Sequence, residues 1–448
     1  MNPKRKYMKF LYRWVNEAAP VKRCRKDLQK THQPYNIIIY RLQSLIIILF
    51  CDLVVCLYIC CKTIIMIKRF IEKEIQKIFS LKKAIIIYGA RQVGKTTLTN
   101  RLLADYKDKT IIFNGDEPDI RILFEKAGSI KLKNLIGPNS FVVIDEAQKI
   151  TDIGAIVKLI HDNIPDVQLF VTGSSSFDIA NYTKESMTGR KLEFILYPLI
   201  FSELVEKHGL LHEKRMLDNR LVYGSYPEIV THGNHAKRLL KSLASSYLYK
   251  DILTLESVKK PVLIEKLTKA LALQIGSEVS YNELAGLLNA DKSTIEKYID
   301  ILEKSFILFR LGSYSKNVRN ELKKSRKIYF WDNGIRNAII GNFSGIDQRT
   351  DSGALWENYL VSERLKLNTY LDKERESFFW RTTQQQEIDY VEVENGKIYA
   401  YEFKWSTHKK SKIPLTFRKA YKPVIESIIN PDNYEDFLLA DFKQTNSV

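Results

Sequence analysis

The chain has 448 residues, of which 45% are hydrophobic and 27% charged, and these values are ordinary for a globular protein of two to four domains. All five cysteines lie within the first 61 residues, which excludes a disulfide framework and a cysteine metal site from the rest of the chain and fits a reducing compartment. The net charge of +18 favours an anionic partner such as nucleic acid or a membrane surface.

Residues 1–65 differ from the rest. They carry 12 Lys/Arg against three acids, and an apolar run from Leu45 to Cys61 is interrupted only by Asp52. A membrane anchor or a cleaved signal peptide would export everything after the run, because 11 of the 12 basic residues precede it. The next segment carries a nucleotide-hydrolase motif that needs cytoplasmic ATP. We therefore favour a cytoplasmic protein whose natural start is Met66, with a membrane partner expected only if residues 1–65 are translated.

Residues 84–103 predict a nucleotide site. An apolar β-branched run leads into a G-x-x-x-x-G-K-T loop, and a helical pattern follows. In this motif backbone N–H groups face phosphate oxygens, the lysine reaches the β/γ-phosphates, and the threonine hydroxyl binds Mg²⁺. The helix adds its positive dipole end. We expect ATP and Mg²⁺ to be held by Gly89, Ala90, Arg91, Gln92, Val93, Gly94, Lys95, Thr96 and Thr97.

The stretch FVVIDEAQ, residues 141–148, predicts a second buried strand. The strand ends at Asp145 and Glu146. We expect Asp145 to hold the Mg²⁺ through water and Glu146 to orient and deprotonate the attacking water. The alternative is that both are N-terminal acids of the next helix.

The stretch QLFVTGSSS, residues 168–176, predicts a third buried strand that ends in hydroxyls. Thr172 or Ser174 would either sense the γ-phosphate or cap the next helix. Further along, Arg190 is a candidate arginine finger, a group that stabilises transferring phosphate in trans. A lone arginine before a strand is more often a surface residue.

At these residues the chain resembles prokaryotic AAA-family ATPases of the AAA_14-like group. The segments that carry the resemblance are GARQVGKTT, VVIDEAQ, FVTGSSS, GRKLEFILYPLIFSEL and GSYPEIV. It implies a doubly wound α/β P-loop ATPase domain at 66–205 and a helical connector at 206–260, and the spacing of strands and helical segments agrees. Such proteins usually begin near the position of Met66.

Residues 261–345 change to a mostly helical pattern. Ser280 with Glu283, and Ser293 with Glu296, have capping-box spacing. The short turn between the two predicted helices is typical of a helix-turn-helix. The apolar FILFRLGSYS that follows would form a wing. The family resemblance implies a winged helix here.

A basic segment runs from Lys304 to Arg336. It predicts a phosphate-binding surface and thus a nucleic-acid partner, with DNA favoured over RNA. The alternative is a packing module with a solvated basic face, and the acids of the second helix weaken any reading of the major groove. The nine basic residues are Lys304, Arg310, Lys316, Arg319, Lys323, Lys324, Arg326, Lys327 and Arg336.

Residues 387–405 predict a β-hairpin with Asn395-Gly396 as a two-residue type I′ turn. This register sets Asp389 opposite Glu402 and Glu387 opposite Lys404, with all four on the face that carries Val391, Val393, Ile398 and Ala400. Opposed carboxylates normally repel across strands. A divalent cation would reverse the sign of that interaction.

The D-x₁₂-E-x-K spacing resembles the core of PD-(D/E)xK nucleases. The resemblance implies a restriction-endonuclease-like α/β domain at 346–448, with Mg²⁺ or Mn²⁺ held by Asp389, Glu402 and Glu357. Lys404 would steady the water nucleophile or the developing phosphate charge. Ile388 stands where the fullest pattern has proline. The alternative is a Glu387–Lys404 pair with Asp389 hydrogen-bonded to backbone.

Together these patterns predict an ATP-hydrolysing AAA protein, capable of forming a homo-oligomer, that binds nucleic acid and carries a metal-dependent nuclease site. The alternative is a nucleotide-dependent switch or scaffold whose nuclease-like domain is catalytically inactive.

Overall fold

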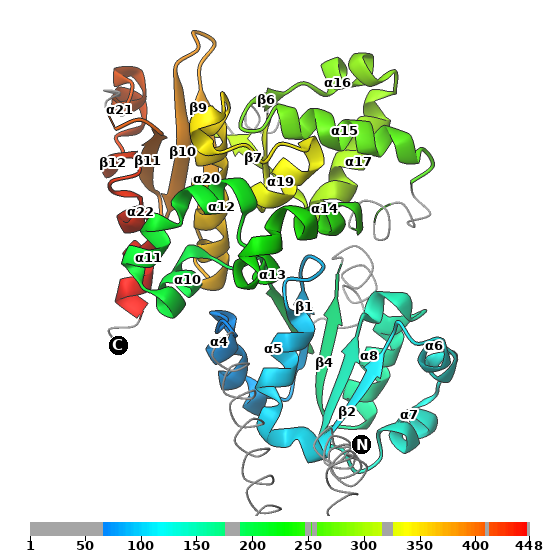
Figure 1. Cartoon of the computed structure of the whole chain (residues 1–448). Coiled ribbons are helices and arrows are strands. Elements are labelled where there is room, and N and C mark those ends of the chain that lie inside the picture. The colour runs from blue at the N-terminus through cyan, green and yellow to red at the C-terminus, as the bar shows by residue number, and fades with distance from the viewer. Residues whose placement is uncertain are drawn as a thin grey trace, which may run out of the picture. The chain divides into compact units, whose positions relative to one another are not determined.

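The computed structural model describes residues 66–174, 189–246, 252, 258–315, 326–407 and 412–445 (Figure 1). Residues from Ile67 onward belong to one compact unit. The leader 1–65 lies outside the described residues. So do four members of the basic segment, Lys316, Arg319, Lys323 and Lys324.

The first part of the chain builds a five-stranded parallel sheet in the spatial order β2-β3-β4-β1-β5. Its strands are β1 (Ala84–Tyr88), β2 (Thr110–Asn114), β3 (Phe141–Asp145), β4 (Gln168–Gly173) and β5 (Lys191–Ile195). The central strands are buried almost throughout, as near-continuous apolar runs covered on both faces should be. The predicted α/β P-loop fold with its three strands is confirmed.

Helices cover both faces of this sheet, with α5 on one side and α8 on the other (Figure 1). The helices are α4 (Ile71–Lys77), α5 (Lys95–Leu102), α6 (Pro118–Phe124), α7 (Ser129–Ile136) and α8 (Ile153–Asn163). Because all five strands are parallel, the carboxyl ends of β1, β3 and β4 meet at one edge. The loop after β1 therefore lies beside the polar ends of β3 and β4.

A run of short helices follows β5. They are α10 (Phe201–His208), α11 (Leu210–Arg215), α12 (Leu217–Tyr223), α13 (Pro227–Thr231) and α14 (Ala236–Ser246). The next elements are α15 (Pro261–Leu273), β6 (Glu278–Val279), α16 (Tyr281–Leu288), α17 (Lys292–Lys304), β7 (Leu308–Ser313), β8 (Arg326–Phe330) and α19 (Asn333–Ile340).

The two predicted helix starts have different outcomes. Ser280 caps α16, because its hydroxyl accepts from the backbone N–H of Glu283 at 3.3 Å. The prediction for Ser293 is wrong. Helix α17 begins one residue earlier, at Lys292, and its N-cap is Asp291, which makes no side-chain capping bond. Ser293 therefore lies inside the helix.

The C-terminal elements are α20 (Ser352–Tyr370), β9 (Glu376–Arg381), β10 (Glu387–Glu394), β11 (Lys397–Phe403), α21 (Leu415–Tyr421), β12 (Ile425–Ile429) and α22 (Tyr434–Thr445). Strands from both sides of residue 345 share one seven-stranded sheet in the order β12-β11-β10-β9-β7-β8-β6. The link between the two groups is the parallel pairing of β7 with β9.

The predicted hairpin is confirmed in its turn and in its ladder. Asn395 and Gly396 both have positive φ, 50° and 75°, as a type I′ turn requires. Glu394 pairs with Lys397, and the register continues to Tyr390 opposite Tyr401.

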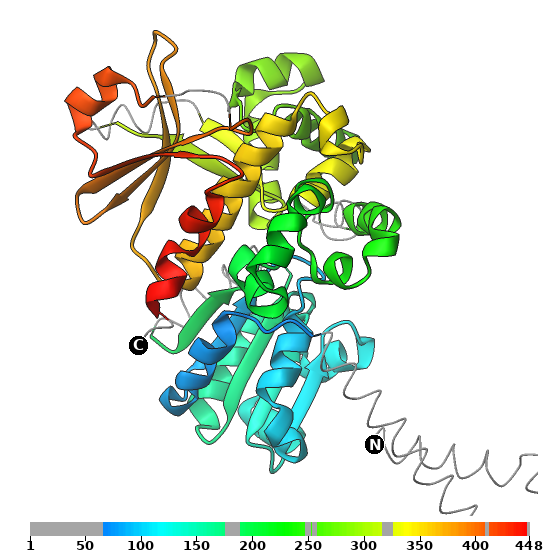
Figure 2. The same cartoon turned by 60° about the vertical axis from the view of Figure 1, so that its left-hand side comes forward.

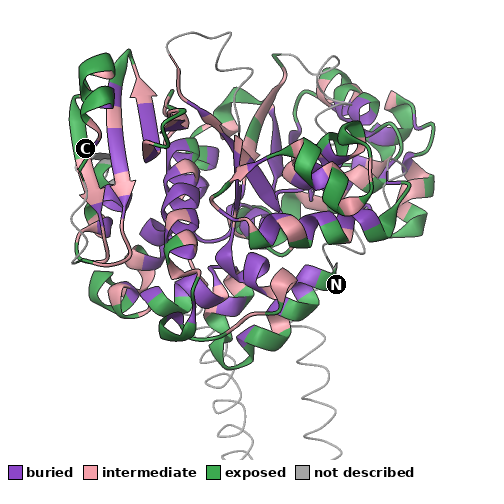
Figure 3. Ribbon diagram, turned by 90° about the horizontal axis from the view of Figure 1, so that it is seen from above, coloured by how far each residue is buried: buried purple, intermediate pink, exposed green. Residues whose placement is uncertain are grey.

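Helix α20 lies at the centre of the C-terminal part, beside α22 and across the sheet (Figure 2). Trp356 and Leu360 are fully buried, and buried residues gather in the central helix and strands while the outer helices are exposed (Figure 3). Within the described part of the chain, none of the helices combines the length and the apolar character needed to span a bilayer.

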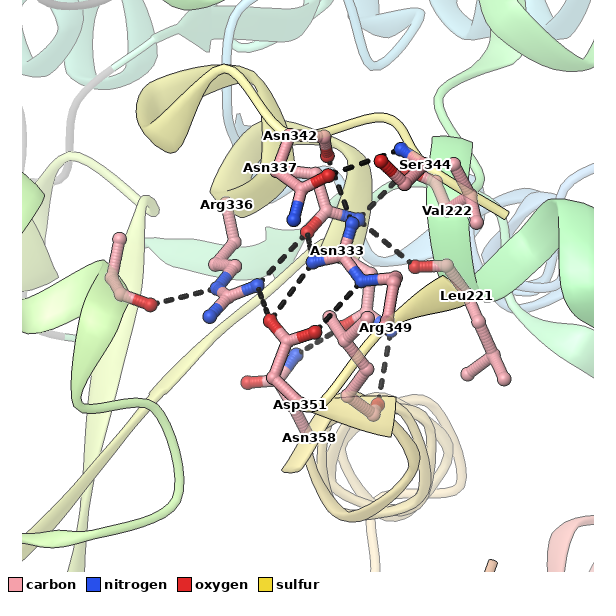
Figure 4. A network of polar contacts seen from close by, with 12 residues as sticks. Leu221, Val222, Asn333, Arg336, Asn337, Asn342, Ser344, Arg349, Asp351 and Asn358 are labelled. Carbon is pink, nitrogen blue, oxygen red and sulfur yellow. Dashed lines mark hydrogen bonds and ion pairs between the residues drawn. The ribbon is translucent and has the colours of Figure 1, made fainter. Parts of the chain in front are cut away.

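A buried polar network joins α19 to the start of α20 (Figure 4). Arg336 and Arg349 both donate to Asp351, at 2.6 Å and 2.8 Å respectively. Arg336 also donates to the carbonyl of Ala272, and both arginines donate to Asn337. Every described contact of Arg336 is therefore internal, and this residue does not belong to the predicted basic surface.

Candidate functional sites

The loop between β1 and α5 has the backbone that phosphate binding requires. Gly89 has φ +152°, and a Cβ at this position would lie 2.1 Å from the carbonyl oxygen of Leu196. Gly94, at φ +97°, is the N-cap of α5. Only glycine fits at Gly89, because the backbone of Leu196, directly after β5, approaches the loop too closely for any side chain.

Lys95 and Thr96 begin α5. The Lys95 ammonium is buried and donates to the carbonyl oxygens of Gly89 and Ala90, at 2.8 and 2.9 Å. The Thr96 hydroxyl donates to Asp145 Oδ2 at 2.8 Å. The structure thus brings the predicted magnesium hydroxyl and the predicted magnesium carboxylate together.

The end of β3 is held from two sides. Asp145 Oδ1 accepts from the Thr172 hydroxyl and from the backbone N–H of Glu146. Glu146 adopts a left-handed conformation, φ 48° and ψ 42°, which is uncommon for a residue other than glycine. The Glu146 carboxylate accepts from Gln148 Nε2 at 2.6 Å, and the same nitrogen lies 2.9 Å from the Ser174 hydroxyl.

Sequence reasoning placed Ser174 in this site but missed Gln148. The amide of Gln148 connects the predicted water-activating carboxylate to the end of β4, where a γ-phosphate sensor was expected. The sequence signal that could have identified Gln148 is its position in the DEAQ motif, three residues after Asp145.

Arg190 lies away from these groups. Its backbone carbonyl accepts from the N–H of Ala84, at the beginning of β1, whereas the nucleotide loop follows the other end of that strand. Its side chain forms an ion pair with Asp162 at 2.9 Å. Arg190 therefore does not reach the nucleotide loop of its own chain.

The C-terminal hairpin does gather charged side chains. Asp389 Oδ2 accepts from the backbone N–H of Phe403 at 2.7 Å. The Lys404 ammonium donates to Glu402 Oε1 at 2.6 Å and lies 3.9 Å from Asp389 Oδ2. Burial lowers the pKa of Lys404, but Asp389 and Glu402 raise it more, so the ammonium stays charged.

Two residues from other elements complete what we call the acidic cluster: Glu357, Glu387, Asp389, Glu402, Lys404 and Lys327. Lys327 of β8 donates to Glu357 Oε1 at 2.9 Å and also pairs with Glu387. The hydroxyl of Tyr329 donates to the same oxygen of Glu357 at 2.7 Å. The alternative reading is met in part: Asp389 is hydrogen-bonded to backbone, but Glu387 lies beside Lys327 and Arg381 instead of Lys404.

A β-bulge modifies the predicted faces of the hairpin. The pairing of β10 with β9 shifts register between Ile388 and Val391. Ile388 and Val391 consequently share one apolar cluster with Ile398, although an odd number of positions separates them. The expectation of one uninterrupted alternation from Asp389 to Val393 is therefore wrong. Bulges of this kind often lie next to active sites, where they re-aim a side chain.

The acidic cluster has an electrostatic imbalance. Burial raises the pKa of Asp389 well above its usual range, and Glu357 and Glu402 raise it further, against Lys327 and Lys404. A group of carboxylates that disfavours its own ionisation is stabilised by a divalent cation. The donors are all carboxylate oxygens, which fit Mg²⁺ or Mn²⁺.

The described members of the basic segment contribute less surface than predicted. Lys327 and Arg336 are 2% exposed, and Arg310 is held by Glu303 and Asp300. Arg326 is half-buried, and Lys304 is exposed. Burial of a charge is tolerated only with a partner. The partners of Lys327, Arg336 and Arg310 lie within the protein.

A second cluster of metal-ligand types lies at the junction of α10 and α11. Of the described residues, His208, His212 and Glu213 form the group whose ligand atoms all lie within 4.8 Å of one another. However, Arg220 donates to both oxygens of Glu213, at 2.9 and 3.0 Å. Because this arginine already neutralises the carboxylate, we assign the cluster a structural role.

Three family models match parts of the chain. Residues 81–205 match an AAA domain. Residues 214–345 and 352–441 match two domains of unknown function, DUF8612 and DUF4143. Uncharacterized proteins are similar over most of the described chain. One from Mycobacterium tuberculosis is 25% identical over 71% of this chain and 70% of its own. One from Methanocaldococcus jannaschii is 25% identical over 79% of this chain and 82% of its own.

Solved structures give weaker similarity. The Thermotoga maritima RuvB Holliday junction branch migration motor is 16% identical, covering 57% of this chain and 95% of its own, with a TM-score of 0.28. The Drosophila ORC bound to AT-rich DNA and Cdc6 is 11% identical, covering 62% and 91%, with a TM-score of 0.23. No activity follows from scores this low. Sheet order, loop geometry and the family match together define residues 81–205 as an AAA-type P-loop ATPase domain.

Proposed function

We propose that the protein binds and hydrolyses ATP and couples this reaction to nucleic-acid binding, with metal-dependent phosphodiester cleavage at the acidic cluster. The observation that supports the first half is the 2.8 Å hydrogen bond between Thr96 and Asp145. This bond joins the first turn of α5 to the end of β3, where a nucleotide-bound Mg²⁺ would lie. In this proposal Lys95 neutralises the β/γ-phosphates, and Glu146 orients and deprotonates water.

The nucleotide site is tested by two substitutions. Lys95→Ala removes the ammonium and should abolish ATP binding while the protein stays folded. Glu146→Gln removes only the base, so it should retain ATP without turnover. ATP binding and phosphate release are measured for both variants and for the wild type. If all three turn over ATP equally, the assignment of the nucleotide site is wrong.

The observation that supports the second half is that Asp389 and Glu402 lie beside Lys404, and Glu357 beside the buried Lys327. Among the described residues, the carboxylate oxygens of these three acids do not all lie within 4.8 Å of one another. Glu357 comes from α20 and the other two from the hairpin, so the fold assembles acids that are distant in sequence. A bound Mg²⁺ or Mn²⁺ would supply Lewis-acid activation of a phosphodiester. In this proposal Lys404, which lies beside Asp389 and Glu402, would stabilise negative charge that develops on the phosphate.

An alternative function is a nucleotide-dependent switch or scaffold whose C-terminal domain binds without cutting. The observation that favours it is the pairing of Lys327 with Glu357 and Glu387, which already neutralises part of the cluster. Incubation of DNA with wild type and Asp389→Ala, with Mn²⁺ or EDTA and with or without ATP, separates the two. Cleavage that needs both Mn²⁺ and Asp389 supports the nuclease, and no Mn²⁺-dependent cleavage supports the scaffold.

We propose further that α15–α17 with β6–β8 form a winged helix, because two helices precede a β-hairpin that pairs with β6. Lys323, Lys324 and Arg326 are the basic residues to test, and Lys327 is excluded because it is buried. Changing these three residues to Ala should weaken nucleic-acid binding. It should also reduce the slope of log affinity against log salt concentration by the amount expected for about three phosphate contacts. Unchanged affinity and salt slope would show that the segment does not bind phosphate.

An arginine-finger role for Arg190 requires a second copy of the chain, and we propose a homo-oligomer for that role. Arg190→Ala should then lower ATP turnover at concentrations where the wild type is oligomeric. If the wild type is oligomeric and its ATP turnover does not depend on Arg190, the arginine-finger role is wrong. The role of Arg190 is then its ion pair with Asp162.

A further inference from the structure

Arg69, just before α4, connects the nucleotide loop to the segment after β5. Its Nη1 donates to the carbonyl oxygen of Val93 at 2.7 Å, and its Nη2 donates to the carbonyl oxygen of Tyr197 at 2.6 Å. Its Nε donates to Glu203 Oε1 at 3.1 Å. The guanidinium is a rigid planar fork, so these three partners fix where it lies. Arg69 is 7% exposed.

Tyr370 brings the end of α20 to the same place. Its hydroxyl accepts from the backbone N–H of Tyr197 at 2.9 Å and from Arg69 Nη2 at 3.3 Å. Its ring stacks on Phe70, with centroids 5.8 Å apart and planes 10° apart. The last residue of α20 is therefore bonded to the arginine that contacts the nucleotide loop.

The opposite end of the same helix belongs to the acidic cluster. Glu357 precedes Tyr370 by 13 positions, a separation of about 20 Å along a helix axis. Between them Leu360 and Leu367 are buried in two different hydrophobic cores. A packed helix of this kind shifts as a unit rather than bending freely.

We infer that Arg69 and α20 couple the two sites, so that nucleotide binding at the loop changes the position of Glu357 and thereby the cation affinity of the acidic cluster. This inference rests on the proposed function of both sites. The element with two arrangements is the loop 89–94. Phosphate would draw the Lys95 ammonium away from the carbonyls of Gly89 and Ala90. Val93, in the same loop, holds Arg69, so the rearrangement displaces the arginine.

Coupling of this kind is reciprocal, and its usual size is a five- to 150-fold change in affinity. It is measurable without any catalytic activity. Amide hydrogen exchange of the full chain is followed by mass spectrometry at constant Mg²⁺, with and without a non-hydrolysable ATP analogue. In the wild type, peptides from 84–103 should exchange more slowly with the nucleotide. Peptides from 352–370 and 387–403 should change by about five-fold or more.

Tyr370→Phe removes the shared hydroxyl and keeps the ring on Phe70. It should preserve the response of 84–103 and lose the response of 352–370 and 387–403. Ser362→Ala is the matched control, because it removes another hydroxyl of α20 that donates only within the helix, to the carbonyl of Tyr359. The control should keep both responses. Arg69→Lys, which keeps the charge but loses the fork, should behave as Tyr370→Phe does.

The outcomes separate the coupling from the proposed function. If peptides from 84–103 do not respond in the wild type, nucleotide binding itself fails. If they respond while 352–370 and 387–403 do not, the coupling is overturned and the nucleotide site stands. If both Tyr370→Phe and Arg69→Lys fold and keep the distant response, the route through Arg69 and Tyr370 is wrong.

Discussion

Replacing Lys327 with methionine tests whether the acidic cluster is a cation site. The Lys327 ammonium is 2.9 Å from Glu357 Oε1 and also pairs with Glu387. Burial lowers its pKa, but the surrounding Tyr329, Glu357, Asp389 and Glu387 groups raise it well above the usual value. Methionine keeps most of the side-chain volume and removes only the charge. The substitution therefore leaves the acids without their buried counter-charge.

The size of the effect follows from the geometry. Two unit charges 2.9 Å apart attract by about 6 kcal/mol at an effective dielectric of 20, and removing one partner of a buried pair costs about 3–5 kcal/mol. The side chains of Glu357 and Glu387 are 17% and 28% exposed, so solvent screens part of this. We expect Lys327→Met to lower the free energy of unfolding by about 3 kcal/mol in EDTA.

A divalent cation should restore that loss. The variant carries one more net negative charge than the wild type in the cluster, so Mn²⁺ should bind it more tightly. At 100 times the dissociation constant, binding to the folded state adds about 2.7 kcal/mol. Lys404→Met is the control, because the Lys404 side chain is 27% exposed and the loss of its charge should cost less.

The assay is denaturant unfolding in EDTA and in MnCl₂, without nucleotide. Tryptophan fluorescence is a suitable signal, because Trp356 lies 5.6 Å from Trp405 within the C-terminal part. The reasoning is refuted if Lys327→Met loses less than about 1 kcal/mol in EDTA. It is also refuted if Mn²⁺ stabilises the variant no more than the wild type.

Three further predictions concern single groups. Because burial raises the pKa of Asp389 well above its ordinary value, the folded protein binds this proton more tightly than the unfolded chain does. The contribution of this group to the stability of the folded state is then lost as the pH rises through the raised pKa. Asp389→Asn should weaken this dependence of stability on pH, measured by melting curves recorded in EDTA. Gln148→Ala removes the 2.6 Å hydrogen bond to Glu146 and should lower ATP turnover about ten-fold, with little change in nucleotide affinity. Gly89→Ala places a Cβ 2.1 Å from the Leu196 carbonyl oxygen and should abolish nucleotide binding in a fluorescence titration.

The nucleotide site was predictable because its information is local. A parallel strand, a glycine loop and a helix follow one another directly, and the polar ends of parallel strands must meet at one edge. The hairpin turn was predictable for the same reason, since Asn395 and Gly396 tolerate positive φ. In each case the residues that make the feature lie within a few positions of one another.

Contacts between distant segments were not predictable. Lys327 was counted among surface bases, because nothing in its immediate neighbours shows that β8 lies beside α20. Arg69 carried no motif at all, and its partners lie 24, 128 and 134 positions away. The bulge after Ile388 was missed because its mark on the apolar pattern is slight: Ile388 and Val391 break strict alternation, as any two neighbouring apolar residues in a strand can do.

Two acids of β10 have opposite pKa shifts, and the contrast between them bears on the proposed cation site. Glu392 is 1% exposed. Burial raises its pKa, but Arg364, which donates to both its oxygens, lowers it further, so the net shift is downward. Asp389, three residues earlier, has its pKa shifted upward despite two lysines nearby. Both oxygens of Glu392 already accept hydrogen bonds from Arg364, so a cation would add no stability there. The arrangement around Asp389 retains excess carboxylate where an apolar residue would cost less, and strongly shifted carboxyl groups of this kind concentrate at functional sites. The contrast within one strand therefore favours a structural role for Glu392 and supports the proposal that Asp389 binds a cation.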